Sequence, residues 1–189
     1  MQSAPTIVLC PGVHSPNLTQ SFRHQLAAAL RPTVRTLIFP SDRYPAYSTP
    51  DVLRFLHEEL NGDRSPDWQQ IPIIWIGFSA GVVGAMGAAI AWELLGGNVQ
   101  ALFALDGWGV PAIGNFPVHR LSHDYFTHWS SALLGTGQDS FYADPEVEHL
   151  ALWRSPQAIQ GYWISAYAKH QSSLLQFLVH WLNFYSTKA

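Results

Sequence analysis

Four mainly apolar runs, separated by stretches with helical periodicity, constrain the fold of this sequence more than any other feature. The runs cover residues 6–10, 34–39, 73–76 and 99–105. Strands that are apolar along their whole length, and not only at alternate residues, are typical of parallel sheets covered by helices on both faces. The sequence therefore predicts an α/β fold with a mostly parallel sheet.

Helices are expected between these strands, at residues 17–30, 49–61 and 80–95. Pro32 ends the periodicity of the first, Gly62 follows the second, and a pair of glycines follows the third. After residue 106 the pattern is less regular. It predicts a strand at 118–121, a helix at 125–134, and one long or broken helix at 156–185, whose apolar face is formed by Ile159, Trp163, Tyr167, Leu174, Leu178 and Trp181.

Chain length and charge limit the class of protein. A chain of 189 residues is expected to form one domain over residues 1–189, and 48% hydrophobic residues supply a core for it. The net charge is -3 and there is no basic run, which argues against nucleic acid as a partner. Cys10 is the single cysteine, so neither an intramolecular disulfide nor a cysteine-based metal site can form.

The location of the protein is predicted from the same features. The N-terminus has no positively charged segment before its short apolar run, so no secretion signal is expected, and the single cysteine fits a reducing cytoplasmic setting. Residues 71–92 carry no charge and are long enough to cross a bilayer. Pro72 and four glycines within this stretch favour a buried strand running into a buried helix, and no membrane span.

The segment from Gly77 to Gly81 has the pattern G-x-S-x-G and lies where the third strand meets its helix. In a nucleophile elbow, a serine occupies a sharp turn between strand and helix, and small flanking residues allow the two elements to approach. Ser79 would be held clear of the sheet at a helix N-terminus, where free N–H groups favour negative charge. The alternative is a glycine and serine loop that only packs the helix on the sheet.

With this motif, the chain resembles the α/β-hydrolase family, and in particular its small serine hydrolases without a lid domain. The resemblance covers most of the sequence and implies a triad in the order Ser, Asp, His. The segment from Leu9 to His14 resembles the family's loop after the first core strand, with a proline where the family usually has histidine. It implies that the backbone N–H groups of Val13 and Ala80 form the oxyanion hole.

The resemblance also selects a catalytic histidine. In the family this residue is commonly followed by six residues and a proline at the start of the last helix. His149 and Pro156 have this spacing, so His149 is the expected general base. The strand that should precede the histidine is interrupted at Asp144 and Pro145, and a structural surface histidine remains the alternative.

Two aspartates compete for the role of the catalytic acid. Asp124 follows the strand expected at 118–121, where the family commonly has its acid, and is preferred. Asp106 ends the fourth strand at the carboxyl edge of the sheet and is the alternative. Either residue could instead cap a helix or turn.

The resemblance implies hydrolysis of a carboxylic ester or thioester through an acyl-enzyme, with a small-molecule substrate and no cofactor. Gly12, His14, Phe78 and Trp108 are expected to contact this substrate in a rather open site, because too few residues follow the fourth strand for a lid domain. A catalytically inactive scaffold and an acyltransferase that uses the same residues are the alternatives. The oligomeric state remains open.

Three histidines close together in the sequence raise the question of a metal site. His119, His123 and His128 lie close to Asp124 in the sequence, and both histidine and aspartate can bind a metal ion. They are not clearly placed at i and i+4 on one predicted helix. We therefore expect no metal site.

Overall fold

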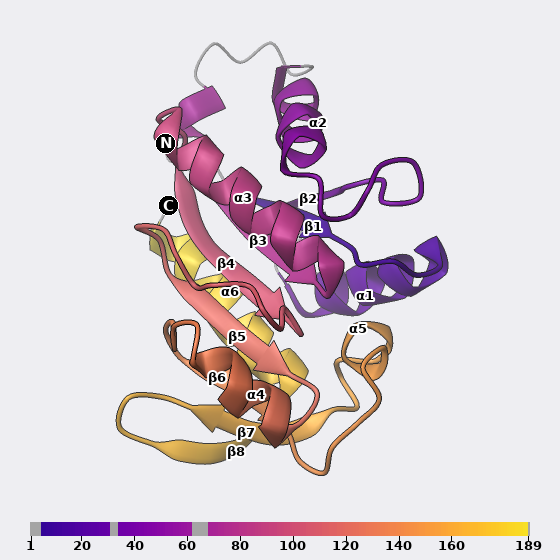
Figure 1. The fold of residues 1–189 in the computed structure, drawn as a ribbon, viewed down its shortest axis with the longest axis vertical. Coiled ribbons are helices and arrows are strands. Elements are labelled where there is room, and N and C mark those ends of the chain that lie inside the picture. Colours follow the sequence, from indigo (N-terminus) through magenta and orange to yellow (C-terminus); the bar gives the residue numbers. More distant parts are fainter. Residues whose placement is uncertain (1–4, 31–33, 62–67, 189) are drawn as a thin grey trace.

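An eight-stranded sheet organises the computed structural model, which describes residues 5–30, 34–61 and 68–188 (Figure 1). The strand order is β2-β1-β3-β4-β5-β6-β7-β8, in which β1 to β6 pair in parallel and β7 and β8 are antiparallel. This mostly parallel sheet confirms the predicted fold class. The strands are β1 (Thr6–Cys10), β2 (Arg35–Ile38), β3 (Ile73–Phe78), β4 (Val99–Leu105), β5 (Val118–Ser122), β6 (Ser140–Ala143), β7 (Gln160–Ile164) and β8 (Lys169–Ser173).

Helices cover both faces of the sheet. Helices α1 and α6 pack on one face, and α2 and α3 pack on the other, as the separate core clusters and Figure 1 show. Helix α4 lies against β5 and β6, and a 3-10 turn, η1, precedes β3. The helical segments are α1 (Pro16–Ala29), α2 (Thr49–Asn61), η1 (Trp68–Gln70), α3 (Ala80–Leu94), α4 (Tyr125–Ala132), α5 (Ala151–Arg154) and α6 (Leu174–Lys188).

Strand β3 shows why a central strand is apolar along its whole length. Ile74 and Ile76 pack in the cluster that contains α1 and α6, whereas Ile73 and Trp75 pack in the cluster that contains α2 and α3. All of these side chains are completely buried. Burial of one such side chain contributes about 1.5–3 kcal/mol to stability, so both faces of the strand favour this central position.

The first four strands and three helices lie within a few residues of their predicted positions. Residues 71–92, which could have been a membrane span, form most of β3 and α3. Within the described part of the chain, no helix has the length and apolarity needed to span a bilayer. Pro32 and Gly62, which were expected to mark helix ends, lie outside the described residues.

The prediction for residues 156–185 is wrong in its first half. Strands β7 and β8 form a hairpin there, and only α6 is helical. Gly161 fits this strand because a Cβ at that position would lie 2.0 Å from the carbonyl oxygen of Tyr142 on β6. Strand β6 ends directly before Asp144, where the sequence interrupts the strand expected ahead of His149, and it pairs with β7 along its whole length.

Candidate active site at the carboxyl ends of the parallel strands

Ser79 lies in a sharp turn between β3 and α3. Its φ of 54° is in the left-handed region, which non-glycine residues rarely adopt, and its N–H donates to the carbonyl of Leu105 at 2.9 Å. A Cβ at Gly77 would lie 2.8 Å from Cα of Val82, and one at Gly81 would lie 2.1 Å from the carbonyl oxygen of Cys10. These glycines permit the close approach that the turn requires.

The loop after β1 passes beside this turn. A Cβ at Gly12 would lie 3.0 Å from Cβ of Ser79, so the loop backbone is close to the serine. Among the residues that the structure describes, the N–H groups of Val13 and Ala80 have no acceptor. Val13 is 83% exposed, and its side chain does not line the cleft described below. Cys10 is buried in the strand below, and burial raises the pKa of its thiol, which argues against a thiolate.

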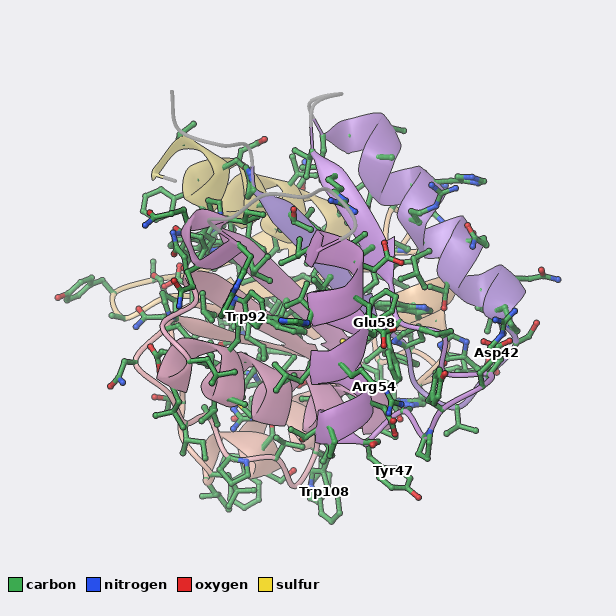
Figure 2. All side chains as sticks on the ribbon, turned by 90° about the horizontal axis from the view of Figure 1, so that it is seen from above. Asp42, Tyr47, Arg54, Glu58, Trp92 and Trp108 are labelled. Atoms are coloured by element: carbon green, nitrogen blue, oxygen red, sulfur yellow. The ribbon has the colours of Figure 1, made fainter. Side chains whose placement is uncertain are left out.

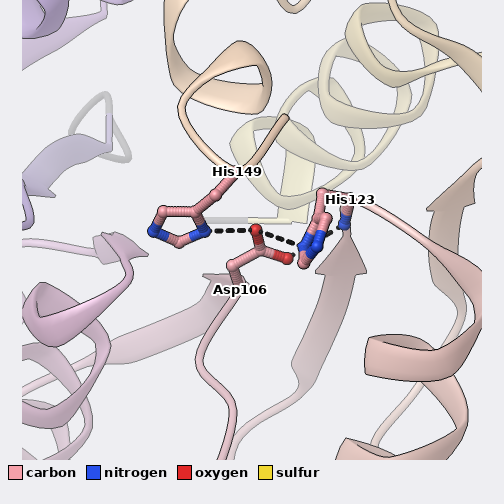
Figure 3. Close-up of side chains that lie close together, drawn as sticks. All are labelled: Asp106, His123 and His149. Carbon is pink, nitrogen blue, oxygen red and sulfur yellow. Dashed lines mark hydrogen bonds and ion pairs between the residues drawn. The ribbon is translucent and has the colours of Figure 1, made fainter. Parts of the chain in front are cut away.

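Asp106 directly follows β4 and, like Ser79, has a positive φ, 50°. Its buried carboxylate accepts three hydrogen bonds (Figure 3). Nδ1 of His149 donates to Oδ2 at 2.7 Å, Nδ1 of His123 donates to the same oxygen at 2.9 Å, and the peptide N–H of His123 donates to Oδ1 at 2.9 Å. Because both rings use Nδ1–H here, Nε2 of His149 is left as the basic nitrogen.

The structure corrects the expected pairing of Asp124 with His149. Asp124 is the N-cap of α4, and its Oδ1 accepts the N–H of Thr127 at 2.6 Å. Although partial burial opposes it, this hydrogen bond and the nearby His123 hold the pKa of Asp124 below its ordinary value. The carboxylate that contacts His149 is that of Asp106, since the histidine reaches the end of β4 and not the end of β5.

His149 is placed on a turn directly before α5, and an aromatic stack supports its ring. The ring lies on Phe78, with centroids 4.7 Å apart, and Phe78 lies on Trp153 at 5.2 Å. The side chain of His149 is 42% exposed, so it remains accessible to a substrate. The expected start of the last helix at Pro156 is wrong, because α5 occupies the intervening residues and α6 begins at residue 174.

The stack also corrects two expected substrate contacts. Phe78 is completely buried under His149, so it supports the histidine and does not face a substrate. His14 packs beside the same stack, 5.6 Å from the Phe78 ring and 6.3 Å from the Trp153 ring. Gly12 is buried next to Ser79. Of the four residues expected to contact substrate, Trp108 is the one that lines the cleft.

This cleft has a volume of about 460 Å³ and joins the nucleophile candidate to the histidines. Its apolar walls include Val83 on α3, Trp108 after β4, and Phe126 on α4. Trp108 is 68% exposed and projects from the edge of the molecule, unlike Trp92, which is buried in α3 (Figure 2). The complete lining is Ser79, Ala80, Val83, Asp106, Trp108, Val110, His123, Phe126, Thr127 and His149.

Hydrogen bonds fix the apolar wall formed by α4 and the loop after β4. The buried guanidinium of Arg120 donates to the carbonyl of Gly135 at 2.7 Å and to that of Val110 at 2.9 Å. Nε1 of Trp108 donates to Oγ of Ser130 at 3.2 Å. The two segments are therefore linked at several points, as a fixed wall and not as a separate lid.

The structure separates His119 from His123, two of the three histidines that lie close together in the sequence. His119 points into the core, where Nδ1 contacts the carbonyl of Asp139 at 2.7 Å and Nε2 contacts the hydroxyl of Tyr185 at 2.8 Å. The donor atoms of Asp106, His123 and His149 instead lie within 4.8 Å of one another, a set that could bind a metal ion. In the geometry found, both ring Nδ1 atoms carry the proton they donate to Asp106, and metal binding would require its removal.

No protein-family model matches the sequence, and no curated protein matches it. Among solved structures, the type II thioesterase YbtT from the yersiniabactin NRPS/PKS biosynthetic pathway matches with a TM-score of 0.52 and 14% identity, over 80% of this chain and 88% of that chain. A cutinase-like protein from Cryptococcus sp. has a TM-score of 0.37 and 17% identity over 56% of each chain, which is too distant to add to this result. The chain thus has the α/β-hydrolase fold.

Proposed function

We propose that this protein is a serine-dependent hydrolase of carboxylic esters or thioesters. The observation that carries the proposal is that one cleft is lined by Ser79, in a strained turn, and by His149, whose Nδ1–H is held by the buried Asp106. A nucleophile, a base and a group that orients the base are the three parts that this chemistry needs. Fold alone would not support an activity.

In the proposed reaction, Oγ of Ser79 attacks the acyl carbon while Nε2 of His149 accepts the hydroxyl proton. The C–O or C–S bond to the leaving group then breaks, and the histidine passes its proton to the departing alcohol or thiol. Water attacks the acyl-enzyme, giving a proton to His149, which returns it to Ser79 as the carboxylic acid leaves. Asp106 keeps the ring in the required tautomer and stabilises the imidazolium.

The oxyanion of the tetrahedral intermediate would be bound by the backbone N–H groups of Val13 and Ala80. Two observations support this role: neither group has an acceptor among the described residues, and the Gly12 backbone lies against Ser79. A donor of this kind lowers the barrier by about 2.7–4 kcal/mol in a comparable enzyme. Because backbone groups act here, substitution of the exposed Val13 side chain should leave the rate unchanged.

The apolar wall supports an apolar acyl group as the part of the substrate that is recognised. Val83, Trp108 and Phe126 are 45%, 68% and 67% exposed, and all three lie in the cleft that contains Ser79. Each methylene that becomes buried against them should favour binding, by up to about fourfold when burial is complete. We therefore expect kcat/KM to rise with acyl chain length.

A fluorophosphonate probe tests the nucleophile. Wild-type protein should be labelled, and Ser79→Ala should not, whereas Ser172→Ala on β8 provides a serine control that retains labelling. A folded wild-type protein that is not labelled would favour the inactive scaffold. Labelling together with product formation only in the presence of an alcohol or amine acceptor would instead favour an acyltransferase.

The substrate is tested with p-nitrophenyl esters and acyl thioesters of increasing chain length. Trp108→Ala should raise KM about tenfold for a long acyl chain, as expected when several methylenes lose an apolar contact, and leave the acetyl ester unchanged. Tyr167→Ala is the control, since this aromatic side chain is fully exposed in the β7–β8 turn. An equal effect of Trp108→Ala on all chain lengths would contradict the acyl-binding role.

A further inference from the structure

We propose that His123 is a positioning residue that holds the Asp106 carboxylate in the orientation needed by His149. This role rests on the proposed hydrolase function. His123 lies at the carboxyl end of β5, its side chain is 26% exposed, and it lines the cleft. No step of the proposed reaction requires a proton transfer to this second histidine, so its contact with Asp106 needs another explanation.

The contact fixes both oxygens of one carboxylate. The peptide N–H of His123 donates to Oδ1, and its ring Nδ1–H donates to Oδ2, each at 2.9 Å. Rotation of the carboxylate would break both bonds at once. Oδ2 is therefore kept where it accepts Nδ1–H of His149 at 2.7 Å, and Figure 3 shows the carboxylate between the two rings.

The backbone of Asp106 explains why such a contact is useful. At φ of 50° the residue is in a conformation that costs about 1–2 kcal/mol, and surrounding contacts have to maintain it. The peptide N–H of Asp106 donates to the carbonyl of Leu121 at 2.8 Å, which ties this turn to β5. Two residues later, the same strand end supplies both groups of His123. Strand pairing between β4 and β5 thus brings the positioning residue to the acid.

On its other side, Nε2 of the His123 ring lies 3.5 Å from Oδ2 of Asp124, the residue that caps α4, which is an ion pair only when the ring is protonated. The ring therefore lies between the carboxylates of Asp106 and Asp124. When His149 becomes positively charged during the reaction, an Asp106 carboxylate already fixed in this way stabilises the charge without reorganisation.

Two substitutions separate the hydrogen bond from the ring that makes it. His123→Phe keeps a ring of similar size but has no donor, and should lower kcat about 10²-fold with little change in KM, because the acid and base become misaligned. His123→Asn keeps an N–H donor attached to Cγ, and should keep kcat within about fivefold of wild type. His170→Phe, at an exposed histidine on β8, is the matched control and should leave kcat unchanged.

Proton NMR of the wild-type protein with labelled histidine tests the contact without relying on turnover. We expect two imidazole N–H resonances shifted downfield that disappear in Asp106→Ala. One of them should also disappear in His123→Asn, and the other in His149→Asn. Absence of a hydrogen-bonded N–H from His123 would overturn the proposal.

Activity measurements complete the test and distinguish the two hypotheses. A wild-type protein that the fluorophosphonate does not label removes the hydrolase function and, with it, the role of His123. A labelled and active wild type whose His123→Phe variant is equally active removes the role of His123 alone. Loss of wild-type activity in EDTA, with recovery on adding Zn²⁺, would make His123 a metal ligand and also overturn the proposal.

Discussion

The turn at Ser79 and the turn at Asp106 follow neighbouring strands and place a non-glycine residue at almost the same φ, 54° and 50°. They are maintained in different ways. Around Ser79, the absence of side chains at Gly12, Gly77 and Gly81 lets three segments of backbone meet. Around Asp106, hydrogen bonds from two histidines hold the carboxylate.

The two turns should therefore respond to different kinds of substitution. The turn at Ser79 depends on space, so added volume should disturb the fold there even when no polar group is changed. The turn at Asp106 depends on charge and hydrogen bonding, so an isosteric change should remove activity while the fold survives. The comparison can be tested at both turns.

The largest effect is expected from Asp106→Asn, which keeps the shape of the side chain and removes its charge. An amide facing Nδ1 of His149 favours the wrong tautomer, and kcat should fall about 10⁴-fold. Steady-state hydrolysis of an activated ester measures this loss, and circular dichroism with thermal unfolding checks the fold. A fall of less than tenfold would show that Asp106 is not the orienting acid.

Gly81→Ala should have the largest effect on stability. Its Cβ would lie 2.1 Å from the carbonyl oxygen of Cys10 and 2.5 Å from that of Pro11, so backbone would have to move, at a cost of about 3 kcal/mol. Urea unfolding measures this cost. The control is Gly109→Ala, where a Cβ meets nothing within 4 Å and only the positive φ opposes alanine, at about 1 kcal/mol. Equal effects of the two variants would contradict the role of space.

The buried His119 on β5 predicts how the stability of the fold depends on pH. Burial lowers the pKa of His119 to about 4, so its ring is neutral in the folded protein, whereas in the unfolded chain it takes up a proton below the ordinary value of 6.5. The unfolded state then binds more protons, and stability should fall by about 3 kcal/mol as pH falls from 6.5 to 4. In His119→Phe this part of the pH dependence should be absent, whatever the stability of the variant.

Unfolding in urea at several pH values measures the effect at His119. His170→Phe, the same substitution at an exposed histidine on β8, serves as the control. If His119→Phe and wild type lose stability in parallel between pH 6.5 and 4, buried His119 is not responsible for the dependence.

The smallest effect is expected at Asp124. Asp124→Ala removes the cap of α4 and should cost about 1 kcal/mol of stability, while Asp124→Asn keeps a good N-cap and should cost less. Both variants should retain kcat within about fivefold, since the contact between Asp124 and the His123 ring is long at 3.5 Å and partly exposed. A loss of several orders of magnitude in Asp124→Asn would restore Asp124 as the acid.

The first half of the fold is readable in the sequence because local and tertiary signals agree there. Fully buried strands such as β3 are apolar throughout, and the motif around Ser79 lies where a strand ends and a helix begins. Such local signals could not identify which aspartate orients His149. Asp106 and Asp124 both follow strands, and the choice between them depends on how far the His149 ring extends across the sheet, which is a tertiary contact.

The β7–β8 hairpin shows why the later strands were not predicted. Its turn contains neither glycine nor proline, the residues that mark most turns in a sequence. Ser165 closes it instead: its N–H donates to the carbonyl of Ala168 at 2.9 Å, and its Oγ accepts the N–H of Ala168 at 3.1 Å. The spacing of Ile159, Trp163 and Tyr167 favoured a helix, but these residues lie before, on and after β7. Trp163 packs against Phe177 of α6, and Tyr167 is fully exposed in the turn.

The antiparallel pairing of β6 and β7 has a consequence for protein engineering. Because the two strands run in opposite directions, the segment that carries His149 leaves the sheet and returns to it at the same edge. Its two ends meet where the N–H of Asp144 donates to the carbonyl of Gln160 at 3.1 Å. Extra residues inserted between 144 and 148 are therefore expected to extend this segment beside the open cleft while the strands keep their register.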